Sequence, residues 1–393
     1  MNENVLDLIN QSEYNFYFLV VDPFLDISLF PQIKNFFLIY SHKNNHLKKL
    51  KEQNIPYFCL EEQGINLTEK NSGKLLSHPK VLDYIKNTSS KNKHKIAIIP
   101  FKPSAKIDFI CKKYSWTNIS NPSPVNRFLE DKIKFVNFCQ KNNLPITPSF
   151  IDNFNLPNFQ KYQQQLGSSL VIQTHFGWAG NSTFKANSWE EIKNQIPKNT
   201  LVKYTTFLKG YSLLNNCCQT KHGLLQSPPA LQYTGLPDFT QNPFATVGRQ
   251  WPSFVPPQIQ EQIKDITEKF STVINKMGYK GFFGLDFLVS DDQVFLLECN
   301  PRLTASFDFY TQMEIKNNIM PLFFFHIAEF INIDYPIDIK KEDRFYNSNL
   351  VGSELIKRDA NNNTIEKIKR FSAFSVSYSP IKIKPSVYKL FTW

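Results

Sequence analysis

Two short apolar runs in the C-terminal half give the clearest pattern of hydrophobic and polar positions. The runs Leu285–Val289 and Val294–Leu297 are rich in Phe, Leu and Val, and the polar segment Ser290–Gln293 lies between them. Apolar runs of this length on either side of a turn-forming segment predict a β-hairpin. Because both faces of each run are apolar, a buried sheet is expected, with a surface hairpin as the alternative.

Two acidic residues occupy this hairpin. If its centre lies near Asp292, Asp286 and Glu298 face each other with Cβ atoms about 5 Å apart. Like charges at that separation need a cation between them, or one must hold a proton. Side chains alternate along a strand, so Asn300 and Arg302 continue on the face of Glu298. Sparse oxygen ligands suit Mg²⁺, which takes its other ligands from water and substrate phosphates. The alternative is a pair of ordinary solvated acids.

The first part of the chain alternates strand-like and helix-like runs. Strands are predicted at 15–21, 35–41, 56–61 and 95–101, and helices at 46–54, 78–87 and 106–114. This alternation predicts a parallel sheet with helices packed on it. The segment VVDPFLD follows the first strand where a dinucleotide-binding protein would carry GxGxxG, so this part is not an obvious dinucleotide binder.

The Pro-, Ser- and Asn-rich segment 120–126 predicts a domain boundary. Beyond it the pattern predicts a helix at 127–142, a strand at 169–176, a loop at 177–183, a strand at 201–208 and an amphipathic helix at 258–277. Ser188 with Glu191 three residues later predicts a capping box at a further helix. Gly278 stands where the amphipathic helix is expected to end.

Composition narrows the class of protein. The 393 residues carry a formal net charge of +11, but the basic residues are mostly scattered lysines rather than a stripe, so no nucleic-acid partner is expected. The basic excess can still help to hold anionic phosphates. The length allows two or three domains with their own cores.

The lack of a recognisable targeting signal and the pattern of cysteines both favour a soluble cytoplasmic protein. The six cysteines include no CxxC pair and no disulfide-dense framework, which is typical of reduced thiols. The N-terminus lacks a basic segment followed by an apolar core, and no apolar run approaches the length of a membrane span. No membrane partner is therefore expected.

From about residue 124 to 309 the chain resembles the ATP-grasp enzymes, and the preceding α/β part resembles the domain that usually precedes them. The resemblance is carried by G-Y-x-G-x-x-G-x-D-F, a hairpin, and L-E-x-N-P-R, here Gly278 to Arg302. It implies that Asp286 and Glu298 bind Mg²⁺ bridging the phosphates of ATP, with Mn²⁺ as a substitute, and that Asn300 assists. It also implies that Arg302 steadies acyl-phosphate chemistry.

The segment VIQTHFGWAGNSTF resembles the family's phosphate loop, whose glycines let backbone N–H groups approach phosphate oxygens. The resemblance implies nucleotide contacts at Gly177 and Gly180. Gln173 stands where a phosphate-binding lysine is common, and it donates a hydrogen bond but brings no charge. Trp178 either covers the closed site or packs within the lid. Lys132, in LEDK, corresponds to a phosphate-reaching cation or is a surface lysine of a helix.

The strand LVKYTTFL resembles the segment that recognises adenine through its backbone, which implies that role for Lys203, Tyr204 and Thr205. Val202 replaces an acid often found there. Arg249, expected in an aromatic and proline-rich loop, either grips a phosphate or substrate carboxylate or forms a structural salt bridge. His175 and His222 are interpreted as structural.

The resemblance predicts an α/β (α+β) fold: an N-terminal pre-ATP-grasp domain at 1–120, an ATP-grasp domain at 121–335 with a lid at about 145–203, and a small C-terminal subdomain at 336–393. The implied activity is ATP-dependent ligation of a small-molecule or peptide carboxylate to an amine or thiol, with an amino-acid or peptide ligase of natural-product biosynthesis as one form of it. A homodimer is an open alternative. Two other functions stay open. One is carboxylation with bicarbonate, as in biotin carboxylase, and the other is nucleotide binding without catalysis.

Overall fold

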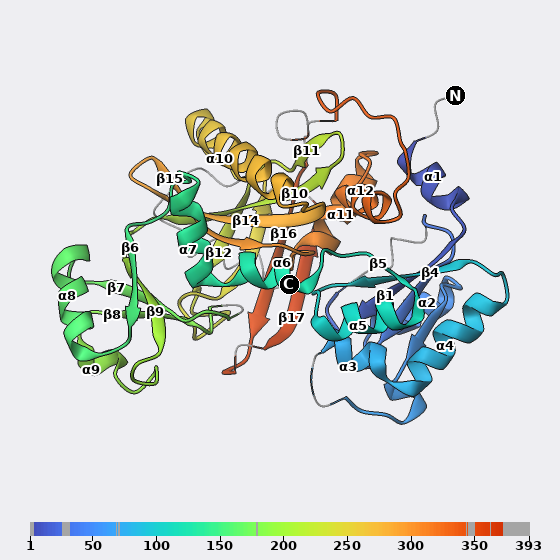
Figure 1. The fold of residues 1–393 in the computed structure, drawn as a ribbon, viewed down its shortest axis with the longest axis horizontal. Coiled ribbons are helices and arrows are strands. Elements are labelled where there is room, and N and C mark those ends of the chain that lie inside the picture. Colours follow the sequence, from blue (N-terminus) through green and yellow to red (C-terminus); the bar gives the residue numbers. More distant parts are fainter. Residues whose placement is uncertain are drawn as a thin grey trace.

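The computed structural model describes residues 4–25, 32–67, 69, 71–177, 180–342, 344, 350–361 and 363–371. These residues form three sheets with helices packed on them. In Figure 1 the N-terminal sheet (blue) and a small lid (green) lie at opposite ends of the molecule, and the largest sheet (yellow to red) lies between them. This mixed α/β architecture confirms the predicted fold class.

The N-terminal sheet has five parallel strands in the order β3-β2-β1-β4-β5, which confirms the predicted parallel sheet. Its strands are β1 (Tyr14–Val20), β2 (Phe36–Tyr40), β3 (Tyr57–Cys59), β4 (Lys95–Pro100) and β5 (Thr117–Asn118). Its helices are α1 (Val5–Gln11), α2 (His46–Glu52), η1 (Glu61–Gln63), α3 (Ser72–Ser77), α4 (Pro79–Ser90) and α5 (Ala105–Tyr114).

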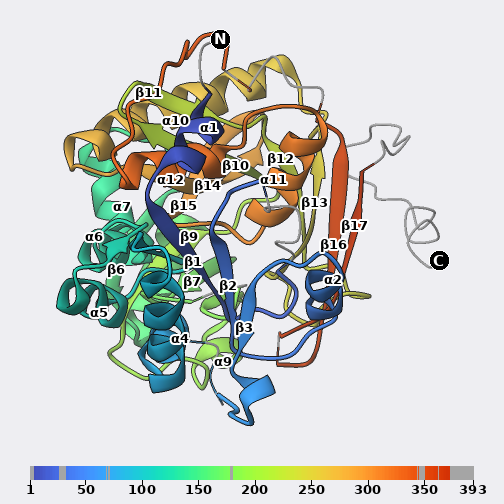
Figure 2. The ribbon, with the colours of Figure 1, turned by 90° about the vertical axis from the view of Figure 1, so that its right-hand side faces the viewer.

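The largest sheet is antiparallel, with the strand order β15-β14-β10-β12-β13-β16-β17 and β11 paired to β10. Its strands are β10 (Tyr211–Thr220), β11 (Gly223–Gln226), β12 (Ala230–Thr234), β13 (Thr246–Trp251), β14 (Gly281–Ser290), β15 (Gln293–Asn300), β16 (Gly352–Arg358) and β17 (Thr364–Arg370). The helices around it are α6 (Ser123–Glu130), α7 (Lys132–Lys141), α10 (Pro257–Lys276), α11 (Phe307–Lys316) and α12 (Leu322–Phe330). The strands β16 and β17 lie at one edge of this sheet (Figure 2).

The lid is a four-stranded antiparallel sheet in the order β6-β9-β7-β8. Its elements are β6 (Ser149–Asn153), α8 (Leu156–Leu166), β7 (Leu170–Gln173), β8 (Thr183–Ala186), α9 (Trp189–Ile192) and β9 (Leu201–Thr206). Val202 and Tyr204 of β9 are buried in a core with residues of α8 and α9. Lys203 and Thr205 therefore lie on the opposite face of the lid sheet, because side chains alternate along a strand.

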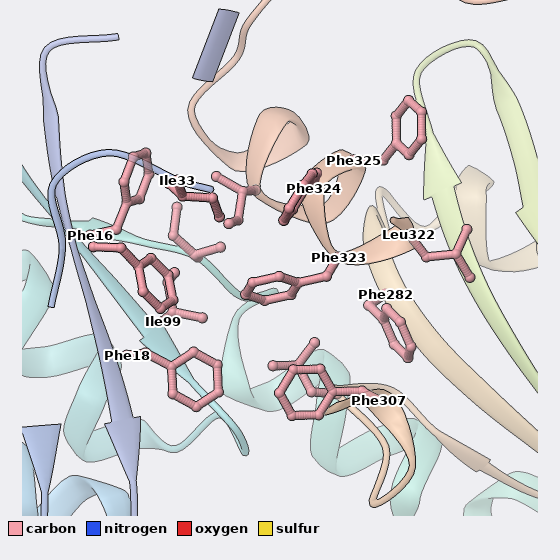
Figure 3. Close-up of a cluster of buried hydrophobic side chains, with 14 of the residues drawn as sticks. Phe16, Phe18, Ile33, Ile99, Phe282, Phe307, Leu322, Phe323, Phe324 and Phe325 are labelled. Carbon is pink, nitrogen blue, oxygen red and sulfur yellow. The ribbon is translucent and has the colours of Figure 1, made fainter. Parts of the chain in front are cut away.

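Packing joins the N-terminal sheet to the rest of the chain. Tyr17 and Leu19 of β1 face a core formed with α3, α4 and α5, whereas Phe16 and Phe18 face a second core shared with α11 and α12. Figure 3 shows this second core, in which the rings of Phe18 and Phe307 stack with centroids 5.8 Å apart. Burial on both faces explains why most residues of β1 are apolar.

Two predicted elements, the hairpin that carries Asp286 and Glu298 and the helix that packs on it, are confirmed. The hairpin is β14–β15, and the amphipathic helix is α10, whose C-terminal stop Gly278 has φ +78°. Residues Phe283, Leu285 and Phe287 pack with α7 and α10 on one face of the sheet. Asp286 therefore faces the other side of β14.

The predicted continuous helix at 127–142 is wrong. It is two helices that meet at Asp131, whose carboxylate accepts hydrogen bonds from the backbone N–H groups of Ile133 and Lys134. A side chain that caps a new helix start satisfies donors that a continuous helix would have paired internally, so the chain turns there.

The predicted capping box is also wrong. The Ser188 side chain makes no capping hydrogen bond, and Glu191 instead accepts from the backbone N–H of Asn187 at 2.8 Å. The domain limits 1–120, 121–335 and 336–393 stay a prediction, although β16 and β17 of the last segment are strands of the largest sheet. All six cysteines are free and buried, and none of the described helices is long and apolar enough to cross a membrane.

Candidate active site

Asp286 of β14 and Glu298 of β15 are cross-strand partners, as the hairpin pattern predicts. Asn300, two residues beyond Glu298, donates a hydrogen bond from Nδ2 to Asp286 Oδ2 at 2.8 Å. Gln232 of β12 donates from Nε2 to Asp286 Oδ1 at 2.6 Å. Both oxygens of Asp286 are therefore oriented by amide groups, and three oxygen-bearing side chains of the hairpin lie together.

Arg302 continues this network toward α6. Its Nη2 donates to Asn300 Oδ1 at 3.1 Å, and its Nε donates to Glu130 Oε1 at 2.9 Å. Glu130 also forms an ion pair with Lys102 at 2.8 Å. These contacts hold the guanidinium beside the hairpin, as expected for Arg302 from the sequence. Its predicted role in acyl-phosphate chemistry stays a prediction.

Lys132 is not a surface lysine. It is the first residue of α7, its side chain is only 9% exposed, and its Nζ forms an ion pair with Glu298. His175 accepts a hydrogen bond at its backbone oxygen from the Lys132 N–H at 2.9 Å. The His175 ring lies 2.9 Å from both carboxylate oxygens of Asp131. His175 thus anchors the start of the phosphate-loop segment to the helix that carries Lys132.

The consecutive residues Glu130, Asp131 and Lys132 each fix a different part of the site. The sequence interpretation selected only Lys132 from them. Three consecutive charged residues between the apolar positions Leu129 and Ile133 were the signal that could have identified the other two. Gln232 was also missed, and no local pattern marks it, since it reaches Asp286 from a strand 54 residues away.

The pKa values of the two carboxyl groups are shifted in opposite directions. Burial, and then the negative charge of Glu298, raise the pKa of Asp286 to about 7. Burial acts to raise the pKa of Glu298 as well, but the charge and hydrogen bond of Lys132 outweigh it and lower that pKa. Lys132 therefore favours the ionised form of Glu298, whereas at Asp286 the opposing charge of Arg249 is outweighed by burial and by the charge of Glu298.

This donor set fits Mg²⁺. It offers oxygen atoms from two carboxylates and one amide, which leaves coordination positions for water and phosphate oxygens. Within the described ranges, no cluster of three or more His, Cys, Asp or Glu side chains forms a cage that could hold a metal alone. An ion at Asp286, Glu298 and Asn300 would therefore be shared with a substrate.

The phosphate loop packs against the 242–244 segment. Gly180 has φ +79°, and a Cβ there would lie 2.7 Å from the carbonyl carbon of Phe244. A Cβ at Gly177 would lie 2.0 Å from Ser182 Oγ. Both glycines are thus required by close approach, and Gly180 by its backbone conformation as well. Trp178, the predicted cover of the site, lies outside the described residues.

The side chain of Gln173 forms a hydrogen bond within the lid sheet. Gln173 Nε2 donates to Thr183 Oγ1 at 3.0 Å within the β7–β8 pair. Its cross-strand neighbour on β9 is Lys203, which is only 3% exposed. Burial, and then the nearby charge of Lys132, lower the pKa of Lys203 to about 8.

Lys203, Tyr204 and Thr205 do not fit a backbone recognition site for adenine. They lie on β9, which pairs with β6 on one side and β7 on the other, so their backbone groups are used within the sheet. Tyr204 is in addition buried in the lid core. The chain leaves the lid sheet directly after Thr206, and Gly210 then lies against β14, where a Cβ would be 2.0 Å from the carbonyl oxygen of Val289.

Arg249 lies in strand β13, not in the predicted loop. Its Nη1 donates to Glu354 Oε1 of β16 at 2.6 Å, and both side chains are buried. Glu354 also pairs with Lys367 of β17 at 3.0 Å. The structure therefore shows the salt-bridge alternative, and it places Arg249 opposite Gln232, which contacts Asp286.

Comparison with known proteins finds one matching family model and several solved structures with a similar fold. Residues 129–306 match the family model described as an ATP-grasp domain. A search of curated protein sequences found no match.

Three solved structures illustrate the similarity of fold. Biotin carboxylase from Campylobacter jejuni, in a β-γ-ATP complex, aligns with 87% of this chain and 75% of its own at 13% identity and a TM-score of 0.63. N5-carboxyaminoimidazole synthase from Aspergillus clavatus, with ADP and an aminoimidazole ribonucleotide, aligns over 88% and 82% at 13% identity and a TM-score of 0.59. N5-carboxyaminoimidazole synthetase from Staphylococcus aureus, with ADP, aligns over 89% and 85% at 11% identity and a TM-score of 0.58. At these identities the likeness is one of fold.

Proposed function

We propose that this chain, whose residues 129–306 match the ATP-grasp domain model, is an ATP-dependent ligase that activates a carboxylate and joins it to an amine. One observation carries the proposal. Asp286, Glu298 and Asn300, with Lys132 and Arg302 around them, form one connected polar network on the hairpin.

In the proposed reaction a carboxylate oxygen attacks the γ-phosphorus of ATP, the bond from that phosphorus to the bridging oxygen breaks, and ADP leaves. The amine nitrogen then attacks the acyl carbon and loses a proton. Phosphate leaves with the oxygen that came from the carboxylate. Such transfers ask the protein mainly for positioning and charge neutralisation.

The network supplies both. Asp286, Glu298 and Asn300 would hold Mg²⁺, which when bound draws negative charge from the phosphate oxygens. The Lys132 ammonium, here paired with Glu298, would be able to bind a phosphate oxygen if a metal took over part of the charge of that carboxylate. The Arg302 guanidinium, fixed by Glu130, offers its remaining N–H groups to the acyl phosphate.

The test follows oxygen transfer. The protein is incubated with Mg-ATP and pooled carboxylic acids and amines, and phosphate release is measured. An acid that gives turnover is then supplied with ¹⁸O in its carboxylate. Phosphate carrying one ¹⁸O is expected. Turnover that leaves phosphate unlabelled would mean that water, not the acid, attacks ATP.

Bicarbonate is the second candidate for the acid. It is favoured by the fold similarity to enzymes named for carboxylation, and one further similar structure, a biotin carboxylase domain of 2-oxoglutarate carboxylase, contains MgADP and bicarbonate. Phosphate release in CO₂-free buffer that requires added bicarbonate would support this candidate. If Mg-ATP binds but neither bicarbonate nor any acid and amine gives turnover, the non-catalytic nucleotide-binding alternative gains.

A further inference from the structure

We propose that the side chain of Lys203 supplies the positive charge for the nucleotide phosphates that residue 173 lacks in this chain. The inference rests on the proposed function, since it concerns the same ATP site. In this proposal the Lys203 ammonium group neutralises phosphate charge, which the uncharged Gln173 cannot do.

The first support is position. Gln173 and Lys203 are Cα partners across β7 and β9, so their side chains lie on the same face of the lid sheet. That face is opposite the lid core, which takes Val202 and Tyr204. Side chains directly opposite on paired strands start about 5 Å apart. A lysine at 203 therefore reaches much of the space that a lysine at 173 would reach.

The second support is that the Lys203 ammonium lacks a partner. The residue as a whole is only 3% exposed, yet its ammonium group makes no hydrogen bond or ion pair within the part of the chain that the structure describes. Lys132, close enough for its charge to act on Lys203, is neutralised by Glu298. A buried ammonium without a counterion is unfavourable, so the fold retains it at a cost in stability.

The third support is the chemistry of what would complete the site. Lys203 lies within the electrostatic reach of Lys132 and of Glu298, which is one of the proposed metal ligands. An anion that enters between the lid and the hairpin would pair with Lys203 and relieve its repulsion with Lys132. A polyphosphate is the anion that also provides oxygens for a metal at Asp286 and Glu298. Gln173 is uncharged and donates its hydrogen bond to Thr183, so the positive charge for the phosphates would come from Lys203.

The test moves the charge across the strand pair. Lys203→Gln should weaken Mg-ATP binding at least tenfold by calorimetry and leave adenosine binding unchanged, because adenosine has no phosphates. Adding Gln173→Lys to that variant, so that the two residues are exchanged, should restore Mg-ATP affinity to within about threefold of the unaltered protein, given the 5 Å separation. Lys198→Gln, which removes an exposed lysine from the same lid, is the matched control and should leave affinity unchanged.

Stability distinguishes a ligand-binding lysine from a structural one. Lys203→Met removes the unpaired charge and keeps an unbranched chain, so the nucleotide-free protein should melt at a higher temperature while Mg-ATP affinity falls. A lower melting temperature with unchanged affinity would assign Lys203 to the lid structure and overturn the proposal. If the unaltered protein binds no Mg-ATP, the proposed function and this inference both fail. If it binds Mg-ATP and the Lys203 variants bind it equally well, only this inference fails.

Discussion

Asp286 and Glu298 lie opposite each other because the β14–β15 ladder shifts by one residue between Asp286 and Phe287. Starting at the turn, the strands pair in regular register from Ser290 opposite Gln293 to Phe287 opposite Leu296. Without the shift, Leu297 would lie opposite Asp286, and Glu298 would face the other side of the sheet. β-Bulges often re-aim a side chain next to an active site. Here the bulge brings two acids to one place.

Glu298→Gln should abolish turnover and remove the stabilisation that Mg-ATP gives to the folded protein. Gln keeps the shape of Glu but cannot neutralise a metal, so ligand binding to the native state is lost. The measurement is the melting temperature with and without millimolar Mg-ATP, together with phosphate release. Asp291→Asn is the control, because it removes an exposed carboxylate from the turn of the same hairpin, where φ is +49° and Asn is tolerated. An undiminished Mg-ATP shift in Glu298→Gln would exclude Glu298 from the metal site.

The same variant also has an effect without metal. From the sequence alone, relief of repulsion with Asp286 predicts unchanged or slightly higher stability for Glu298→Gln. The ion pair with Lys132 opposes this, because Lys132 is nearly buried and would lose its counterion. We therefore expect lower metal-free stability, and recovery when Lys132→Met is added to Glu298→Gln.

Gly180→Val should weaken Mg-ATP binding at least tenfold, which corresponds to about 1.4 kcal/mol. Its side chain would collide with the backbone at Phe244 and would strain a backbone with φ +79°. Gly167→Val is a matched control in the same lid, because Gly167 has φ +104° but no atom within 4 Å of its Cβ position. Equal losses of affinity in both variants would attribute the effect to backbone strain rather than to the loop contact.

The sequence predicted what depends on local periodicity. The parallel sheet, the hairpin, α10 and the pairing of Asp286 with Glu298 are all confirmed. The pairing was reached by placing the hairpin centre near Asp292, whereas the turn is Asp291–Asp292 and the bulge restores the alignment. Periodicity cannot show an extra residue in one strand, because both registers bury similar apolar side chains.

Contacts between distant segments were beyond the sequence pattern. The partner of Lys132 is 166 residues away, and nothing in a helical pattern shows that its first residue turns inward. The unpaired state of Lys203 likewise depends on which segments cover β9. Such features depend on tertiary burial, which a single sequence does not determine.

Arg249→Met tests whether Arg249 binds phosphate in addition to forming its salt bridge with Glu354. As half of a buried ion pair, Arg249 should cost about 3 kcal/mol of unfolding free energy when it is removed, since Glu354 stays buried and loses a partner. Denaturant unfolding measures this loss, and Mg-ATP affinity is measured under conditions where the variant is folded. Replacing Glu354 with Leu in the same protein should recover part of the stability. A phosphate-binding Arg249 would instead show a tenfold or larger loss of affinity that the second substitution does not recover.

His326 should make the protein less stable in mild acid. The His326 ring accepts a hydrogen bond at Nδ1 from the backbone N–H of Phe282 at 3.0 Å, and its Nε2 lies 3.2 Å from the carbonyl oxygen of Ile119. Burial lowers its pKa from 6.5 to about 3. Between these values the unfolded chain binds a proton that the folded protein excludes, so stability is lost as the pH falls below 6.5 and is fully present above it. From pH 7 to pH 5 this one group should remove about 2 kcal/mol of unfolding free energy.

His326→Gln provides the comparison, because Gln offers one acceptor and one donor to the same partners but does not titrate in this range. Denaturant unfolding at pH 7, 6 and 5 should therefore give a flatter pH dependence for His326→Gln than for the unaltered protein, and parallel curves would show that His326 is protonated in the folded state at pH 5.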